Sequence, residues 1–532
     1  MNRISVFARR QRIKNLEQWT MYAILVEAFF IALSPTVASA AVMIGVITWF
    51  LRGRIDSRNK MRTLPFDVPV AIFLLIGAAS VFMSSARNLM LIYNYFMLVG
   101  IYGLTYLIVG QTVQTPAQIK QVAQALGASA IIVVLCGFFQ FAFGVDAADV
   151  KWTDPEAFPE LRKRIFSTLE NPNVLAGYLD VFICLALGLL SKVENRAQKL
   201  VLIVAIVALA SCLAMTYSRG AFLAMAVVFM VYGVLKDWRV LILFAAVTGF
   251  IAFNDTTFVD RITSAFTGSD SSEGVRVGIW VSTIAMISDH PFAGIGWGAY
   301  QYVYPQYNYY VVDPNIIIYH AHNIYLNYAA EIGIVGALAF FWYFFGTMFM
   351  SLGVNFNAED DDDSWTTRAK NIFAGNSFMQ YLEELAEVFN QKFVDFADGL
   401  MHLFGKKAPQ TRKVKKSERP QLELVHHDEL NLPDRRRKRS DNESLADVKK
   451  IAAVSDDDKP LDDDKKTSAI DFSDVTKIDD KNFLDGLRLG IGLAFLSMAL
   501  NGLTDDLLFN IPSSMLMWQL GALGAAINAI RD

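Results

Sequence analysis

The chain has 532 residues with a mean hydropathy of +0.33, and 54% of them are hydrophobic while only 19% are charged. A soluble globular protein usually carries about 25% charged residues, so this composition excludes an ordinary soluble enzyme. The net charge of -4 says little about partners, because the acidic and basic residues are concentrated in different segments. No nucleic-acid partner is expected.

Long apolar runs alternate with short charged interruptions along the chain. A membrane-spanning helix needs about 20 predominantly apolar residues, and twelve stretches approach that length. They lie near residues 21–35, 38–52, 66–84, 89–110, 121–144, 171–190, 199–217, 220–235, 239–254, 323–351, 484–504 and 511–530. Ser34 and Pro35 divide the first two, which could instead form one kinked or re-entrant pair. The expected fold is all-α, a polytopic membrane protein with about 12 transmembrane helices.

The charges between these runs predict an orientation, because cytoplasmic loops carry an excess of Lys and Arg. The N-terminal segment is basic and lacks the small-residue cleavage site of a signal peptide. Loops 53–65 and 191–198 are basic as well, whereas the intervening loops are short and poor in positive charge, except 145–170 and 255–322. We therefore predict a multi-pass inner-membrane protein with both termini in the cytoplasm and these two longer loops outside.

The distribution of charge also divides the chain into segments. Residues 1–351 form the predicted transmembrane domain, and residues 484–532 form the last two spans. The intervening insert, 352–483, alternates acidic and basic blocks and cannot bury enough apolar surface to fold alone, so it is predicted to be cytoplasmic and largely disordered. Its exception is an amphipathic helix at about 373–404, whose apolar side chains share one face.

The outer segment 255–322 is rich in Gly, Tyr and Trp. Within it, Glu273–Ser288 has the apolar spacing of a helix that lies along the outer interface. The following stretches, His290–Phe292 and Gly294–Gly298, predict a turn. This segment is therefore expected to be ordered and to cover the outer ends of the spans.

Three arginines are assigned to the outer side. Arg219 lies at the mouth between two spans, where an arginine normally has an anionic partner or reaches an aqueous cavity. Arg164 precedes a predicted helix that Asn171 or Asn173 would cap, and Arg276 lies on the interfacial helix. Each could instead be an ordinary loop or interfacial arginine that contacts phospholipid. Arginine is nevertheless well suited to phosphate, because its planar fork matches two oxygens at once.

His320 and His322 account for two of only six histidines in the chain. A histidine at an outer interface can act as a general base near neutral pH, or it can be a hydrogen-bonded structural residue. Metal-ligand spacing and a nearby acidic cluster are missing, so no metal and no cofactor is expected. Glu331, in the next helix, could orient a partner or pair with an arginine. These residues predict a site for a lipid-linked phosphate or pyrophosphate with a base beside it.

The run from His322 resembles a known family pattern. His322-Asn323 is followed by nine residues, Gly333, two residues and Gly336, which is similar to the ligase-type pattern of the O-antigen ligase and O-antigen polymerase family. Further similar runs are Thr216-x-Ser218-Arg219-Gly220, Arg276-x-x-x-Trp280, Pro291…Gly294-x-Gly296 and Asn171-Pro172-Asn173. The resemblance covers about residues 164–345. The earlier spans agree only in hydropathy, and the insert departs from the pattern.

The resemblance implies a GT-C-like, all-helical, metal-independent transferase. Such enzymes move a glycan from undecaprenyl pyrophosphate to an acceptor hydroxyl on the outer face of the bacterial inner membrane. By the same resemblance, His322 would activate or position the acceptor, and Arg219 and Arg276 would bind the pyrophosphate. Arg164 is a looser match for a third arginine, and His320 and Asn323 would support the site. The partners implied are the lipid-linked donor, a lipid or glycan acceptor, and membrane lipids.

Several alternatives stay open at this point. The acceptor could be lipid A-core, a protein or a growing glycan, which distinguishes a ligase from an oligosaccharyltransferase or a polymerase. A transporter or flippase would need charged residues along its mid-span helices, and the sequence offers few besides Asp180 and Glu331. A scaffold that works through the insert would lose its function on deletion of residues 360–475, whereas a transferase would keep most of its activity.

Overall fold

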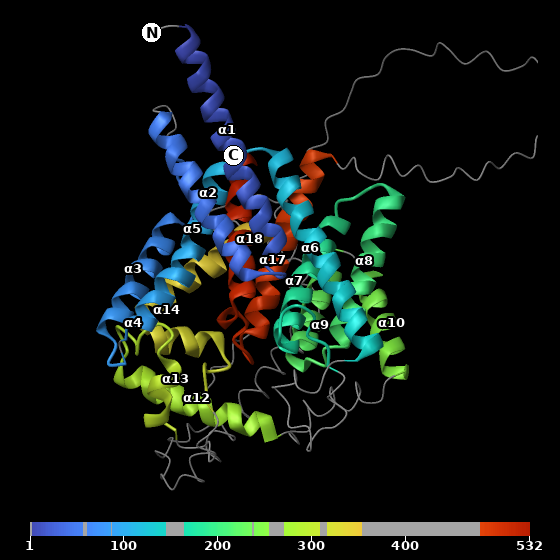
Figure 1. The fold of residues 1–532 in the computed structure, drawn as a ribbon. Coiled ribbons are helices and arrows are strands. Elements are labelled where there is room, and N and C mark those ends of the chain that lie inside the picture. Colours follow the sequence, from blue (N-terminus) through green and yellow to red (C-terminus); the bar gives the residue numbers. More distant parts are fainter. Residues whose placement is uncertain are drawn as a thin grey trace, which may run out of the picture. The chain divides into compact units, whose positions relative to one another are not determined.

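The computed structural model describes residues 3–56, 61–86, 88–144, 164–236, 239–254, 271–308, 317–353 and 479–531 (Figure 1). These residues form helices and connecting turns, without a β-strand among them, so the all-α prediction is confirmed for this part of the chain. The helices are α1 (Arg3–Phe30), α2 (Pro35–Ile55), α3 (Asp67–Met83), α4 (Leu89–Asn94), η1 (Tyr95–Val99), α5 (Gly100–Thr112), α6 (Pro116–Phe143), α7 (Pro172–Leu190), α8 (Arg196–Ala214), α9 (Arg219–Leu235), α10 (Arg239–Asn254), α12 (Ser271–Asp289), α13 (Tyr300–Val303), η4 (Tyr304–Gln306), α14 (Ile324–Leu352), α17 (Asp480–Asn501), η6 (Leu507–Phe509) and α18 (Ile511–Arg531).

Seven helical segments in the described ranges are long and apolar enough to cross a membrane. They are α2, the continuous segment Leu89–Thr112, α6, α7, α8, α14 and α17, and the shorter helices α3, α9 and α10 are also apolar. The count of about twelve spans stays a prediction. The predicted amphipathic helix at 373–404, most of the insert, and residues 145–163, 255–270 and 309–316 of the outer loops lie outside the described residues.

The first two predicted spans are separate helices that pack side by side. α1 starts at Arg3, well before residue 21, and Pro35 occupies the first turn of α2. The Thr20 and Thr48 hydroxyls lie 2.9 Å apart, and the Arg9 guanidinium donates to the Ile55 carbonyl. Because residues near the start of α1 meet residues near the end of α2, the pair is antiparallel rather than one kinked helix.

Glycines allow α7 and α17 to approach until their backbones touch. A Cβ atom on Gly188 would lie 2.3 Å from the Gly490 nitrogen and 2.4 Å from the Gly486 carbonyl oxygen. Gly486 and Gly490 are four residues apart, which is the small-residue spacing typical of close helix contacts in membranes. Figure 1 shows α17 beside α7, although nearly three hundred residues separate them in the sequence. This contact joins a helix from the middle of the 1–351 segment to the helix that follows the insert.

Replacing Gly188 by alanine is therefore expected to destabilise the bundle by about 1–3 kcal/mol, the usual cost of overpacking. The matched control is Gly127→Ala on α6, where a Cβ atom meets nothing within 4 Å. Alanine favours a helix over glycine by about 1 kcal/mol, so the control should unfold at the same or a higher temperature. The measurement is the thermal unfolding midpoint of the purified chain in detergent. Equal midpoints for the two variants would contradict the close contact.

α14 is interrupted at Gly333, and the gap holds the 291–296 turn. Gly333 has φ 71 and ψ 169, a conformation that an L side chain rarely adopts. Its missing Cβ would lie 2.1 Å from the Phe292 carbonyl oxygen. The groups freed by the break are paired, since Ile334 N–H donates to the Pro291 carbonyl at 2.8 Å and Gly296 N–H donates to the Glu331 carbonyl at 2.9 Å. The two glycine-containing runs noted in the sequence thus pack against each other.

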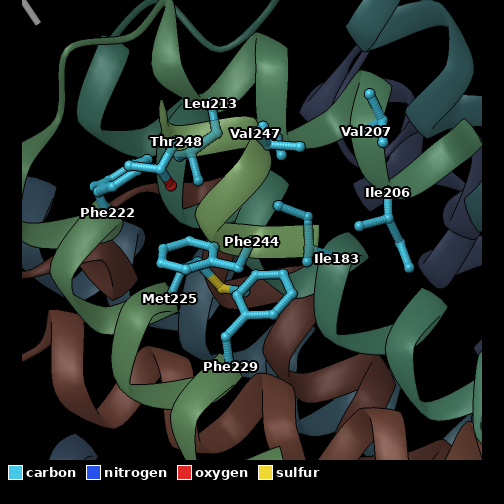
Figure 2. Close-up of a pocket in the computed structure, with 11 residues that line it drawn as sticks. Ile183, Ile206, Val207, Leu213, Phe222, Met225, Phe229, Phe244, Val247 and Thr248 are labelled. Carbon is cyan, nitrogen blue, oxygen red and sulfur yellow. The ribbon is translucent and has the colours of Figure 1, made fainter. Parts of the chain in front are cut away.

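A small apolar cavity of about 20 Å³ lies among α7, α8, α9 and α10 (Figure 2). Its lining is hydrophobic apart from the Thr248 hydroxyl, and the rings of Phe229 and Phe244 stack beside it with centroids 4.7 Å apart. A water molecule needs two to four polar partners, which this lining does not provide. The cavity is a packing void rather than a place for a polar substrate.

Candidate functional site

The start of α14 is tied to the loop that follows α17. Asn323 is the N-cap of α14, and its side-chain oxygen accepts hydrogen bonds from Tyr325 N–H and Leu326 N–H, each at 3.0 Å. Its amide nitrogen donates to the Leu503 carbonyl at 3.0 Å, and Ile324 N–H donates to the Gly502 carbonyl at 2.9 Å. Asn323 therefore fixes the helix start and the 502–506 loop to each other, with His322 beside the junction.

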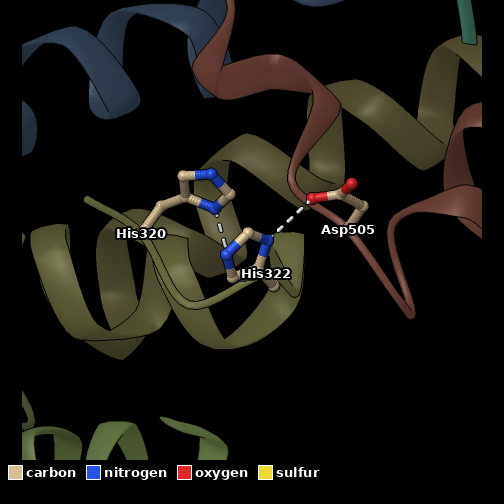
Figure 3. A group of neighbouring side chains, drawn as sticks. All are labelled: His320, His322 and Asp505. Carbon is tan, nitrogen blue, oxygen red and sulfur yellow. Dashed lines mark hydrogen bonds and ion pairs between the residues drawn. The ribbon is translucent and has the colours of Figure 1, made fainter. Parts of the chain in front are cut away.

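His322 and Asp505 form a hydrogen-bonded pair at this junction (Figure 3). The His322 Nδ1 atom lies 3.1 Å from the Asp505 Oδ1 atom. Because a carboxylate accepts hydrogen bonds, this partner assigns the proton to Nδ1 and leaves the Nε2 lone pair available as a base. His322 also has a positive φ of 49, an uncommon conformation for a residue other than glycine that tends to occur at functional sites. We call this pair the His322–Asp505 dyad.

His320 supports the dyad through the backbone. Its Nδ1 atom accepts a hydrogen bond from His322 N–H at 3.1 Å, and the two imidazole rings lie 4.2 Å apart between centroids. Burial, with the nearby charge of Arg276, lowers the pKa of His320 to about 3 even though Asp505 opposes the shift. His320 is therefore neutral near pH 7 and can accept that hydrogen bond, which holds the backbone of His322 in place.

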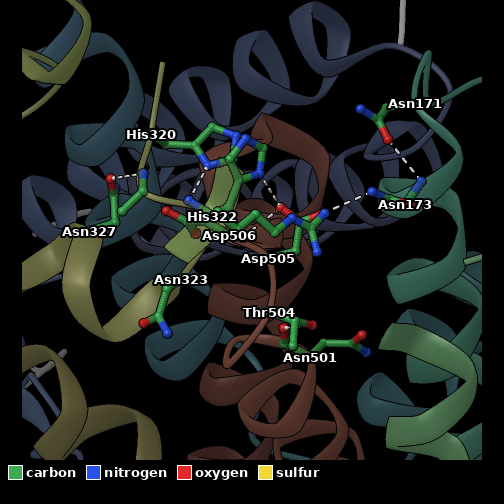
Figure 4. A network of polar contacts seen from close by, with 12 residues as sticks. Asn171, Asn173, His320, His322, Asn323, Asn327, Asn501, Thr504, Asp505 and Asp506 are labelled. Atoms are coloured by element: carbon green, nitrogen blue, oxygen red, sulfur yellow. Dashed lines mark hydrogen bonds and ion pairs between the residues drawn. The ribbon is translucent and has the colours of Figure 1, made fainter. Parts of the chain in front are cut away.

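One predicted arginine lies beside the Asp505 carboxylate, and a second is connected to it through Asn173, which Figure 4 shows next to Asp505. Arg276 Nη2 lies 4.0 Å from Asp505 Oδ2, and Asn173 donates from Nδ2 to that oxygen at 3.0 Å. Arg164 donates from Nη2 to the Asn173 side-chain oxygen at 2.8 Å and from Nε to the Thr216 carbonyl at 2.7 Å. Arg276 is thus near Asp505 directly, and Arg164 is connected to it through Asn173.

These neighbours determine the charge on Asp505. Burial by itself would raise the pKa of the Asp505 carboxyl, but the hydrogen bond from His322 and the charge of Arg276 hold it well below its usual range. The next residue behaves differently, because burial and the charge of Asp505 raise the pKa of Asp506 to about 7. Of this acidic pair, Asp505 is the permanent anion that orients His322.

Arg219 opens α9 next to the same loop. A Cβ atom on its neighbour Gly220 would lie 2.8 Å from the Thr504 hydroxyl and 3.7 Å from the Asn501 side-chain oxygen. α7, α9 and α14 therefore all begin around the 502–506 loop. A helix N-terminus carries a partial positive charge, so three such ends together with arginines make this region favourable for an anion.

The helix predicted at 273–288 is α12, and it is anchored to the histidine segment. Trp280 donates from its indole nitrogen to the Ala321 carbonyl at 3.0 Å, one turn along the helix from Arg276. In Figure 1, α12 runs across the ends of neighbouring helices rather than along them. Arg276 and Trp280 are four residues apart, so they lie on the same face of α12. The location of α12 at a membrane interface stays a prediction.

The other predicted residues have local roles. Asn171 is the N-cap of α7, with its side chain accepting from Asn173 N–H at 2.8 Å, and Pro172 follows it in the first turn, as predicted. Glu331 is buried against the backbone of Gly298 and Tyr300, which follow the turn that fills the break in α14. The sequence prediction missed Asp505, which lies beyond the insert and outside the run that resembles a known family.

Comparison with known proteins identifies the central part of this arrangement. Residues 178–341 match the protein family described as O-antigen ligase. This segment of 164 of the 532 residues is similar to the O-antigen ligase family. It contains Arg219, Arg276 and His322, whereas Arg164 and Asp505 lie outside the matched residues. The comparison with curated proteins gave no significant match.

The family and the helices agree on the general class of the protein. O-antigen ligases are membrane glycosyltransferases that act on lipid-linked glycans and an acceptor, and the resemblance noted in the sequence is confirmed. The apolar helices are those of an integral membrane protein. The chain is therefore an integral membrane protein with a glycosyltransferase domain of the O-antigen ligase type.

Proposed function

We propose that the chain transfers a glycan from undecaprenyl pyrophosphate to a hydroxyl of lipid A-core or a similar acceptor, on the outer face of the bacterial inner membrane. The observation that carries the proposal is that His322 and Arg276 lie beside Asp505, with Arg164 connected to it through Asn173, at the end of the bundle where three helices begin. A base and several cations in one place fit a reaction with a hydroxyl nucleophile and a diphosphate leaving group.

The dyad supplies the base for this reaction. His322 Nε2 takes the proton from the acceptor hydroxyl as its oxygen attacks the anomeric carbon of the donor sugar. The bond between that carbon and the diphosphate oxygen breaks, and its electron pair leaves with undecaprenyl pyrophosphate. Asp505 stabilises the imidazolium that forms on His322. Arg276 and Arg219 offset the negative charge that develops on the departing diphosphate.

The proposed reaction is metal-independent, although one side-chain cluster has the composition of a metal site. His320, His322 and Asp505 can each offer one ligand atom, and these atoms lie within 4.8 Å of one another. However, His320 Nδ1 is already hydrogen-bonded to a backbone N–H, and Asp505 already has Arg276 and Asn173 as neighbours. A second cation beside Arg276 would be repelled, so the hydrogen-bonded dyad is the favoured state.

A transporter is disfavoured by the partners of a buried mid-span acid. Asp180 on α7 accepts hydrogen bonds from Asn501 at 2.8 Å and Ser497 at 3.2 Å, both on α17. Polar residues that line a transport path normally reach a cavity or a transported ion. Asp180 instead connects α7 to α17 next to the 502–506 loop. A structural contact of this kind fits an enzyme with a rigid active site better than a transporter whose helices move.

The proposed function is tested by asking whether donor cleavage depends on an acceptor. Purified full-length protein in liposomes receives undecaprenyl-pyrophosphate oligosaccharide, either alone or with lipid A-core, and release of undecaprenyl pyrophosphate is measured. The expected result is release that rises with lipid A-core and is matched by glycosylated lipid A-core. Movement of intact donor across the liposome without cleavage would overturn the proposal.

Asp505→Asn is expected to slow transfer on the order of 10²-fold, within the range for general-base catalysis. An amide can donate to His322 Nδ1, which would move the proton to Nε2 and remove the base. The measurement is kcat and the KM for the donor in steady-state transfer, because a positioning role for Asp505 predicts a lower kcat with a nearly unchanged KM. Asp289→Asn on α12 is the matched control and should keep wild-type kcat. A loss confined to KM would contradict the assigned role.

A further inference from the structure

Four basic residues line a cavity that lies away from the dyad, where α7 and α9 end and α8 and α10 begin. The cavity has a volume of about 510 Å³, within the range of ligand sites in proteins. Its basic lining residues are Lys192, Lys199, Lys236 and Arg239. Four of its ten lining residues are therefore basic, a lining whose composition favours an anion.

The position of the cavity follows from the helix directions. The dyad lies where α7, α9 and α14 begin, whereas Lys192 follows the last residue of α7 and Lys236 follows the last residue of α9. A helix of 17 to 19 residues is roughly 25–28 Å long, about the thickness of the bilayer's hydrocarbon core. The cavity therefore belongs to the opposite membrane surface, which is the cytoplasmic one in the orientation proposed above.

The walls and surroundings of the cavity are apolar. Leu190, Val193, Ile203 and Val240 line it together with the Tyr232 ring. Next to these residues, α8 exposes Leu200, Val201 and Val204, and α10 exposes Ile242, each at least half exposed. Exposed aliphatic side chains on a membrane helix face acyl chains. One end of a ligand in this cavity therefore contacts basic side chains, and the rest of the ligand contacts aliphatic side chains.

We infer that this cavity binds the headgroup of an anionic phospholipid whose acyl chains lie along α8 and α10. Basic pockets between transmembrane helices at the cytoplasmic surface are suited to the phosphates of such lipids. A free phosphate would contact the basic residues but would leave the apolar walls without a partner. The site is separate from the catalytic dyad and does not depend on the proposed transfer reaction.

Lipid binding to the purified full-length protein tests this site. Native mass spectrometry in detergent measures the Kd of cardiolipin and of phosphatidylcholine for wild type and Lys192→Gln/Lys199→Gln. Each cation in contact with the bound anionic headgroup contributes roughly a five-fold factor to its binding, so the double variant should bind cardiolipin about 25-fold more weakly. Binding of phosphatidylcholine should not change.

Matched variants separate the cavity from general surface charge. Arg10→Gln/Arg54→Gln removes two exposed cations from the ends of α1 and α2 and should change the cardiolipin Kd less than about two-fold. Lys192→Arg/Lys199→Arg keeps the charge and should bind like wild type, while Ile203→Trp fills the cavity and should weaken binding at constant charge. Equal weakening by both Gln pairs, or full displacement of cardiolipin by inorganic phosphate, would overturn the inference.

Discussion

Replacement of His322 by alanine is expected to lower the rate of glycan transfer by roughly 10²–10⁴-fold, the contribution of a positioned general base. The variant loses the Nε2 lone pair that Asp505 orients through the 3.1 Å contact at Nδ1. Donor binding should survive, because the arginines and helix ends that attract the diphosphate are unchanged. The measurement is single-turnover transfer to lipid A-core alongside equilibrium binding of the lipid-linked donor.

Two other histidines serve as controls for that experiment. His290 lies in the turn after α12, and the His290→Ala variant should transfer glycan at the wild-type rate. His320→Ala removes the acceptor of His322 N–H and should cause a smaller loss than His322→Ala, since the backbone around His322 loosens but the base remains. A His320→Ala variant that is more damaged than His322→Ala would reverse the roles assigned to the two residues.

Replacement of Arg276 by alanine is expected to reduce kcat by about 10²–10³-fold, the usual effect of removing one donor that stabilises developing negative charge. Arg276 reaches to within 4.0 Å of Asp505, so its guanidinium lies beside the base and can face the leaving diphosphate at the same time. The KM for the donor should also rise, because the arginine attracts the diphosphate before the reaction starts. The measurement is steady-state transfer over a range of donor concentrations.

Arg276→Lys distinguishes charge from geometry in this position. Lysine keeps the positive charge but not the planar fork that matches two phosphate oxygens, so it should recover only part of the lost rate. Arg196→Ala, at the start of α8 and exposed, is the matched control and should not change transfer. Full activity in the Arg276→Ala variant would contradict the assignment of Arg276 to the diphosphate-binding site.

Hydropathy and capping residues were sufficient to predict most of the described helices. The division at Ser34-Pro35, the cap at Asn171-Pro172 and the helix around Glu273–Ser288 all follow from local chemistry that a sequence contains. Helix contacts do not follow in the same way. The approach of Gly188 to Gly490 and the insertion of the 291–296 turn at Gly333 depend on distant segments, and the sequence alone does not pair them.

The site was predicted in part for the same reason. His322, Arg276 and Arg164 were chosen for their residue type and outer location, and the structure brings them around one carboxylate. Asp505 was not chosen, because a long insert separates it from the histidine segment and a loop acid between two spans is unremarkable by itself. The available signal was the pair Asp505-Asp506 on the outer side, where an acid can orient a histidine.

The central claim is that the His322–Asp505 dyad drives glycan transfer without a metal ion. The most direct test measures transfer from undecaprenyl-pyrophosphate oligosaccharide to lipid A-core by purified wild-type protein before and after exhaustive treatment with EDTA. The account predicts the same rate in both samples, with undecaprenyl pyrophosphate released in step with the glycosylated product. Loss of transfer on chelation, restored by adding a divalent cation, would instead make His320, His322 and Asp505 a metal site and contradict the account.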